Sequence, residues 1–332
     1  MSRPRLKSHA RLLRRGPGTV QLGLASDAGV VLDGLTPAEI DLLGQLDGRA
    51  GLDSLYAAAG SAGVPRERVD SLLAALRGRH LLVEHPTDRA RLGLLSPGRR
   101  DDLTPDADAL AAVYRDGGDG FDHVVARQRQ RVVIGGEGGL AGAVAVLLRC
   151  GGVGRVDVGV EALDATDLDL RLRPPVTKGP DLVVLVGAGA IDPDAGAGWQ
   201  RRGIPHLPLV WQGHRITVGP LVRPGAGPCL RCLDLHRSDR DAAWPALLAQ
   251  LAPHRAVGRA AAVSAATPLT AIAAGITATL VHTHLDTGTV PEGLSLEVSM
   301  PWPRVAHRRW QPHPRCGCAG SPGVEAGTAA HG

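Results

Sequence analysis

The segment RVVIGGEGGLAG, residues 131–142, indicates the fold of the second half of this chain. Its first four residues are typical of a buried strand, and they lead directly into a glycine turn that opens an apolar helix ending at Cys150. The turn matches the pattern G-x-G-x-x-G/A at residues 136–141, where glycines allow a tight turn and a close approach to a phosphate. Strand, glycine turn and helix predict the βαβ unit of an α/β, Rossmann-like domain.

Further apolar runs extend this predicted sheet toward the C-terminus. Residues 181–186 (DLVVLV) are apolar from Leu182 onward, as expected of a strand buried on both faces. The other expected strands are residues 153–160, 205–211, 215–220, 294–300 and 304–310. Residues 263–285 form the most apolar stretch, but a proline, a glycine and two histidines interrupt it, which favours a packed internal helix over a membrane span.

Residues 1–85 predict a small winged-helix-like α+β domain. Three strands are expected, at residues 5–14, 19–25 and 29–33. Three helices are expected after them: the first begins at Pro37, and the other two cover residues 52–59 and 66–77. At the start of the first helix, Thr36 is the expected N-cap residue, and Glu39 completes a capping box. A short extended segment follows at residues 81–84.

The remaining boundaries follow from composition. Residues 86–130 are polar and rich in Arg, Asp and Gly, and we expect a connector without a core of its own. Residues 131–320 then form the Rossmann-like domain, and residues 321–332 a disordered tail.

The composition disfavours several classes of function. The chain of 332 residues is 44% hydrophobic and 21% charged, which is ordinary for a folded soluble protein. Its net charge of +4 is spread along the chain without an aromatic platform, so we expect no nucleic-acid binding. Residues 1–15 lack the apolar segment of a secretory signal, so we expect a cytoplasmic protein with reduced cysteines and no membrane attachment.

Four of the five cysteines stand in two close pairs, Cys229-x-x-Cys232 and Cys316-x-Cys318. Two such pairs can supply four thiolates to one tetrahedral Zn²⁺, and with no position left for water the site would be structural. A redox pair at Cys229 and Cys232, or four unliganded thiols, are the alternatives. His313 is a substitute ligand that four cysteines make unnecessary, and Cys150 is expected to be a buried core thiol.

These motifs resemble the ThiF-like, ubiquitin-activating-type adenylating fold. The shared landmarks are the glycine loop, residues 152–155 (GVGR) before the next strand, and residues 227–232 (GPCLRC), which begin the cysteine tetrad. The resemblance implies activation of a carboxylate as an acyl-adenylate. Active members use an acidic pair after the second strand, an Asn/Arg segment, a Lys, and an Asp that ends a later strand.

This sequence departs from that pattern at most of these positions. The acidic pair falls near Val160 and Ala162, residues 167–171 (DLDLR) carry Asp where Asn is expected, and residues 187–189 (GAG) replace the catalytic Asp. Glu137 also places a carboxylate where phosphates would lie. We therefore expect no catalytic residue and no ATP on this chain, and we interpret Gly136, Gly138 and Gly139 as a degenerate nucleotide loop. The alternative is an active adenylating enzyme whose site is rebuilt from Glu161, Asp164, Asp167 and Arg171.

A narrower resemblance covers nearly the whole chain. Residues 227–245 (GPCLRCLDLHRSDRDAAWP), the C-terminal C-x-C and the small N-terminal domain are similar to the leader-peptide-binding proteins of thiazole/oxazole-modified peptide pathways. These are the cyclodehydratase C-type partners of YcaO enzymes. The resemblance implies that a PqqD-like N-terminal domain binds a precursor's leader peptide as an added strand, and that the ThiF-like part docks the ATP-using YcaO enzyme. A homodimer is a further possible assembly.

The unpaired hydrogen-bonding groups of an edge strand suggest where such a leader would bind. An edge strand offers unpaired N–H and C=O groups to an extended peptide, and a neighbouring helix offers pockets. The expected peptide-binding residues are Val30, Val31 and Leu32 on the strand and Arg66, Val69 and Leu73 on the helix. Arg66, Arg68, Arg77 and Arg79 are candidates for attracting acidic leader residues. The alternatives are that the arginines form a solvated helix face and that Leu73 and the neighbouring leucines of the helix lie in the core.

Overall fold

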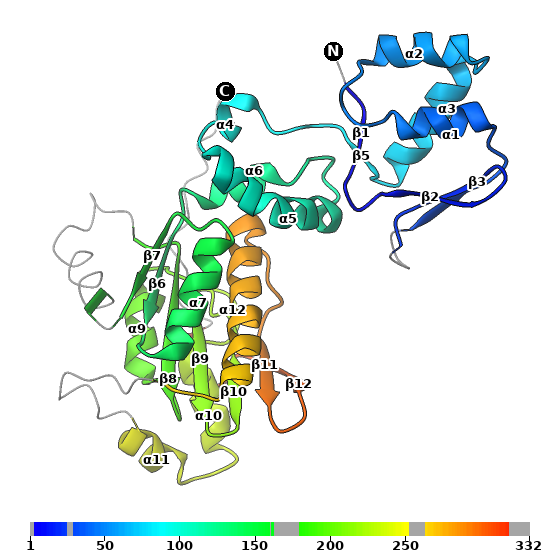
Figure 1. Cartoon of the computed structure of the whole chain (residues 1–332). Coiled ribbons are helices and arrows are strands. Elements are labelled where there is room, and N and C mark those ends of the chain that lie inside the picture. Colours follow the sequence, from blue (N-terminus) through cyan, green and yellow to red (C-terminus); the bar gives the residue numbers. More distant parts are fainter. Residues whose placement is uncertain (1–2, 25–28, 160, 163–178, 252–262, 319–332) are drawn as a thin grey trace, which may run out of the picture. The chain divides into compact units, whose positions relative to one another are not determined.

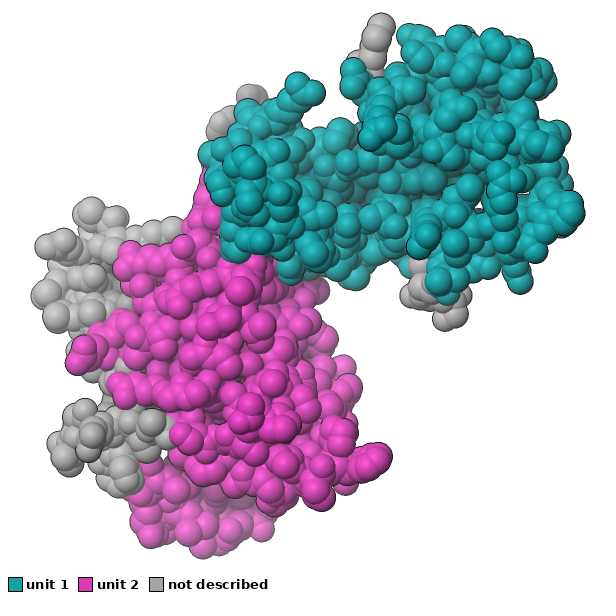
Figure 2. All heavy atoms as spheres, in the orientation of Figure 1, with its two compact units in different colours: residues 1–126 teal, residues 127–332 magenta. Residues whose placement is uncertain are grey.

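The structure, a computed structural model, describes residues 3–24, 29–159, 161–162, 179–251 and 263–318. The chain divides into two compact units, residues 1–126 and residues 127–332 (Figure 2). Each unit has its own buried cores, so the two are described in turn.

Residues 127–332 (unit 2) are built on one sheet of seven strands in the order β12-β11-β10-β9-β8-β6-β7 (Figure 1). The strands β7, β6, β8 and β9 are parallel neighbours, and β9 to β12 are antiparallel neighbours. All seven strands expected in this region are present. Their bounds are β6 Arg131–Gly135, β7 Arg155–Val158, β8 Leu182–Ala188, β9 His206–Gln212, β10 Arg215–Val218, β11 Leu294–Ser299 and β12 Arg304–Arg309.

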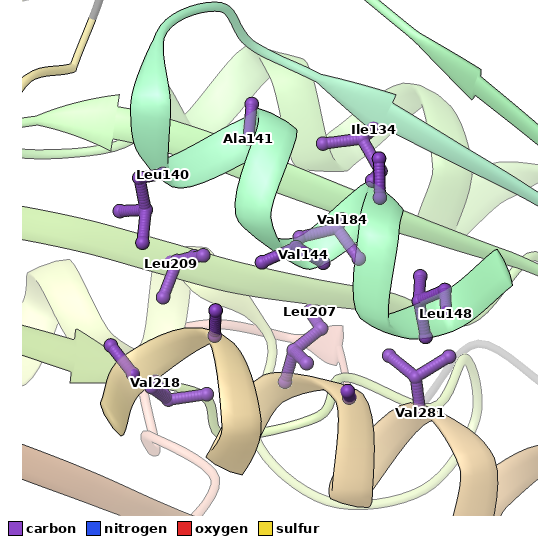
Figure 3. Packing of buried hydrophobic residues seen from close by; sticks show 14 of the residues in the cluster. Ile134, Leu140, Ala141, Val144, Leu148, Val184, Leu207, Leu209, Val218 and Val281 are labelled. Atoms are coloured by element: carbon purple, nitrogen blue, oxygen red, sulfur yellow. The ribbon is translucent and has the colours of Figure 1, made fainter. Parts of the chain in front are cut away.

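Helices cover both faces of this sheet. Val132 and Ile134 of β6 belong to a core shared with helices α7 (Gly139–Cys150) and α12 (Thr267–Thr287), whose side chains interdigitate in Figure 3. Val133, between them, faces the opposite core, because successive side chains of a strand point to opposite faces. That second core is shared with α9 (Pro193–Arg201) and α10 (Leu230–Ser238); α11 (Trp244–Leu251) follows α10.

Two expectations about helices can be compared with this arrangement. The apolar stretch at 263–285 does form a packed helix, α12, which buries Leu269, Ala273 and Val281 against the sheet. Among the described helices none is long and apolar enough to cross a membrane. The expectation that Cys150 is a buried core thiol is wrong: it lies exposed at the last position of α7, past the buried stripe that ends at Leu148.

Residues 1–126 (unit 1) contain a three-stranded antiparallel sheet in the order β2-β3-β4 and a separate β1–β5 pair. The expected strand at residues 5–14 is split in two, because the Ala10 N–H donates to the Lys7 carbonyl and turns the chain. The elements are β1 Arg5–Leu6, β2 Leu12–Gly16, β3 Thr19–Leu22, β4 Val30–Leu32, α1 Pro37–Gly44, α2 Leu52–Ser61, α3 Arg66–Gly78, β5 Leu82–Val83, α4 Arg89–Leu92, α5 Pro97–Tyr114 and α6 Phe121–Arg127, the last of which runs into unit 2.

The capping box at the start of α1 is confirmed. The Thr36 hydroxyl accepts a hydrogen bond from the Glu39 N–H at 3.2 Å, and the Glu39 carboxylate accepts one from the Thr36 N–H at 2.6 Å. The same carboxylate, which is buried, pairs with Arg68 of α3. The cap therefore also ties two helices of this unit together.

The expectation that residues 86–130 lack a core is wrong. Leu103 and Ala107 of α5 are fully buried with Leu95, Val124 and Val125. The apolar residues 103, 107 and 111 lie four apart, so they form a narrow stripe on one side of α5 that the polar composition obscures. The Lys7 Nζ donates to the carbonyl of Ala111 at 2.8 Å, so this helix is bonded to the N-terminal strands.

A buried ion pair gives a test of unit 2. The Arg127 guanidinium donates to both carboxylate oxygens of Asp286, at 2.7 and 2.5 Å, and to the Gly151 carbonyl at 2.7 Å, and both side chains are at most 3% exposed. Asp286→Ala should lower the free energy of unfolding by about 3–5 kcal/mol, because it leaves a buried cation unpaired.

Denaturant unfolding measures this loss. Glu297→Ala, which removes an ion pair to Arg215 that is 37–40% exposed, is the control and should cost less than about 1 kcal/mol. Equal losses for the two variants would contradict the assignment.

Candidate functional site

The glycine loop begins α7 as the sequence predicts. Gly138 is the N-cap residue of α7, with φ 89°, a backbone conformation that favours glycine. Gly136 faces β8, where an added Cβ would lie 2.6 Å from the Val186 Cβ. Gly139 has open space around it. Two of the three glycines are therefore required by the backbone and by strand packing, with no ligand needed to explain them.

The carboxyl ends of the parallel strands carry few groups that could hold a nucleotide. Glu137, in the loop after β6, is exposed. In the described stretches directly after β6, β7 and β8 (136–138, 159, 161–162 and 189–190) there is no lysine or arginine to neutralise a triphosphate. Val160, Asp164, Asp167 and Arg171 lie outside the described residues.

The position of the expected catalytic Asp is closed by packing. A Cβ on Gly187 would lie 2.6 Å from the Ala190 carbonyl oxygen and 2.6 Å from the Ile191 side chain. The chain folds back tightly here, since the Ala190 N–H donates to the Ala188 carbonyl. A carboxylate side chain at residue 187 would thus require the backbone to move.

The loop geometry predicts that alanine substitutions at two of its glycines will affect stability differently. Gly136→Ala should destabilise the protein by about 1–3 kcal/mol, because the new methyl group overlaps Val186. Gly139→Ala should leave stability unchanged or raise it by up to about 1 kcal/mol, because it places a better helix former in open space. Thermal unfolding of the two variants checks this, and a loss at Gly139 equal to that at Gly136 would contradict it.

The four predicted cysteines converge although 84 residues separate the two pairs in sequence. Cys229 is the N-cap residue of α10 and Cys232 lies in its first turn. The Sγ atoms of Cys229 and Cys232 are 3.8 Å apart, those of Cys229 and Cys316 3.4 Å, and those of Cys232 and Cys318 3.2 Å. Tetrahedral coordination with Zn–S bonds of about 2.3 Å needs sulfurs about 3.8 Å apart. The four cysteines are positioned to bind a metal ion.

Burial controls the ionisation of these thiols. It raises the pKa of Cys229, Cys316 and Cys318 to about 11 each. Burial acts on Cys232 in the same direction, but the His313 N–H, which donates to its Sγ at 3.3 Å, helps bring its pKa below the usual value. A metal that binds here must displace protons from thiols whose pKa burial has raised.

A polar network holds the C-terminal cysteine turn in place. The His313 Nδ1 accepts a hydrogen bond from the Arg315 N–H at 3.1 Å, so its Nε2 carries the proton and donates to Asp239 at 2.8 Å. Asp239 also pairs with the Arg315 guanidinium. Sequence reasoning treated His313 only as a substitute metal ligand, whereas here it orients the turn that carries Cys316 and Cys318.

In unit 1, the candidate peptide-binding residues lie in two different environments: an edge strand and the buried core. Strand β4 pairs only with β3 and forms an edge of the described sheet; Val31 is 47% exposed, and Val30 and Leu32 are half-buried. Val69 and Leu73 of α3, at 1% and 2% exposed, lie in the core of the unit and not on a groove wall. Their spacing in α3 directs them inward with Leu72 and Leu76.

The structure also shows which of the candidate arginines in and after α3 have a partner. Arg66 stacks over the ring of Tyr56 at 4.2 Å, Arg68 pairs with Glu39, and Arg77 pairs with Glu84. Arg79 follows the helix and is exposed.

Neither a protein-family model nor a curated protein sequence matches this chain. Among solved structures, the heterocyclase TruD superposes with a TM-score of 0.64 and 18% identity, over 96% of this chain and 43% of TruD. MccB from E. coli, solved with AMPCPP and MccA, gives a TM-score of 0.64 and 14% identity over 97% of this chain and 100% of MccB. PaaA gives 0.62 and 17%, over 91% and 98%. The chain shares its fold with these proteins.

At these identities the likeness is one of fold. It confirms the expected α/β fold, on which four cysteines are positioned to bind a metal ion. The chain spans less than half the length of TruD.

Proposed function

We propose that this chain binds the leader segment of a ribosomal precursor peptide and presents it to a separate YcaO-type cyclodehydratase. The observation that carries the proposal is the open edge of β4, with Val31 exposed between two half-buried neighbours. The fold shared with the heterocyclase TruD and with MccB, which was solved with MccA, supports the proposal.

The binding mode follows from the hydrogen-bonding capacity of a strand. In the described sheet, one side of β4 is bonded to β3 and the other side has no strand partner. An extended leader can add there as a further strand of a winged-helix-like domain, with main-chain hydrogen bonds giving affinity and side-chain pockets giving specificity.

A presenting role without catalysis suits the unit 2 site. Gly187 closes the position of the catalytic Asp, and no lysine or arginine directly follows β6, β7 or β8 in the stretches that the structure describes.

Leader binding can be tested by titration and by hydrogen exchange. A synthetic leader from a precursor gene beside this one should bind the full chain and slow exchange of amides in residues 30–32 that do not bond to β3. Val31→Asp should weaken binding about tenfold or more, because it places a charge on the strand's exposed face. Val31→Thr, a neutral control, should bind nearly as well as the wild type.

No leader affinity in a folded protein would overturn this function. The alternative, an active adenylating enzyme, predicts ATP–pyrophosphate exchange with the precursor peptide and the loss of that exchange in Gly138→Ala.

We also propose that the metal is zinc and that its role is structural. Four sulfur ligands leave no open coordination position, and tetrahedral sulfur sites select zinc or iron. Cys229 and Cys232 belong to the same core as Trp199 and Leu230, so the ion would join the C-terminal turn to that core.

Elemental analysis should find about one zinc per chain. Cys316→Ser should lower both the zinc content and the melting temperature, and metal content should fall on acidification because protons compete for the thiols. Cys150→Ser, which alters the exposed fifth cysteine, should change neither. A visible absorption band with bound iron, or a metal-free folded wild type, would contradict the zinc assignment.

A further inference from the structure

A surface cavity of about 290 Å³ lies in unit 1 at the beginning of β4. It joins three parts of the fold: the start of the edge strand, the turn after α3, and the end of α5. Its lining consists of His9, Gly29, Val30, Gly78, Arg79, His80, Leu81, Ala112 and Arg115. Since Val30 belongs both to β4 and to this lining, a peptide added along β4 would have one end beside the cavity.

The lining is rich in unpaired cations. Whereas Arg68 and Arg77 are held by Glu39 and Glu84, the guanidinium groups of Arg79 and Arg115 have no carboxylate partner among the residues that the structure describes. His80 adds a third basic side chain. A polar cavity with two unpaired guanidinium groups favours a ligand that carries a carboxylate, which a guanidinium can bind through two hydrogen bonds.

The ends of two helices, α3 and α5, contribute to this cavity. His80 and Arg115 have φ values of 56° and 53°, and they are the only non-glycine residues with positive φ in the described chain. Each residue ends a helix in the left-handed conformation that is common at helix C-termini: Arg115 is the C-cap residue of α5, and His80 follows the C-cap residue of α3. Both residues line this one cavity although 35 positions separate them.

The remaining polar groups of the cavity also fit an incoming ligand. The His9 Nδ1 is buried and has no hydrogen-bond partner. Burial, and then the charge of Lys7, lower the His9 pKa, while Asp108 of α5 raises it. Two other nearby acids already have partners, since Glu84 pairs with Arg77 and Asp116 with His123.

We propose that this cavity binds the carboxylate of an aspartate or glutamate side chain near one end of the peptide that lies along β4. The inference rests on the proposed function and adds a specificity to it: the leader must place an acidic residue next to the segment that pairs with the strand. Arg115 directly follows α5, outside the strand and helix from which the groove was expected.

Two measurements on the full chain test this inference separately from leader binding. In the first, capped glutamate (N-acetyl-glutamate N-methylamide) is titrated while the NMR signals of the Arg79 and Arg115 side chains are followed. They should shift with capped glutamate and not with capped glutamine. Inorganic phosphate binding there more tightly than capped glutamate would overturn the assignment to a carboxylate.

In the second, the leader is compared with variants in which single Glu or Asp residues become Gln or Asn. One such change should weaken binding about tenfold, and Arg79→Ala or Arg115→Ala should remove that difference. Arg77→Ala, which removes an equal charge from α3 but is paired with Glu84, should preserve it within about twofold.

The outcomes distinguish the two proposals. A leader that binds equally well to the wild type, Arg79→Ala and Arg115→Ala overturns this inference and leaves leader binding intact. Shifts with capped glutamate in a protein that binds no leader support the carboxylate site and overturn the function. If the leader does not bind and capped glutamate causes no shifts, both proposals are overturned.

Discussion

The structure of unit 2 depends on burying both faces of the parallel strands β6, β8 and β9 at once. Such strands cannot leave a face to solvent, because their apolar side chains alternate between the two sides. One face is covered by two helices, α7 and α12. The other is covered by short helices together with the cysteine cluster and Trp310, so the metal ligands are part of the apolar cover. A metal ion bound by these cysteines would therefore stabilise the sheet as well as the C-terminal turn.

The same constraint explains why a nucleotide-type loop can persist without nucleotide chemistry. Gly136 permits β6 and β8 to approach, and Gly138 provides the turn into α7. Neither task involves a phosphate. The glycine pattern thus reports on the packing of a βαβ unit, and evidence for chemistry has to come from charged groups around the loop, where the described residues supply Glu137 and Glu161.

Much of the fold could be predicted from local signals. Continuous apolar runs marked the strands of unit 2, the Thr36–Glu39 box marked the start of α1, and two short cysteine pairs marked the metal cluster. The core of α5 was missed because its apolar stripe is narrow and lies among charged residues. Which arginines are paired could not be predicted, because Arg68 and Arg77 find their acids through tertiary contacts. The cavity was missed for the same reason: Arg79 and Arg115 come together only in the folded chain.

The hydrogen bond from Lys7 to the Ala111 carbonyl has a consequence for how this protein can be recombined with others. The Lys7 side chain is 3% exposed, and its ammonium group lies at the C-terminal end of α5, where helix carbonyls favour a cation. A chimera that transplants only residues 1–85 would leave this ammonium without its acceptor. A graft of residues 1–126 keeps the donor and acceptor together, so the exchangeable module of this chain ends after α5, beyond the boundary that its sequence suggests.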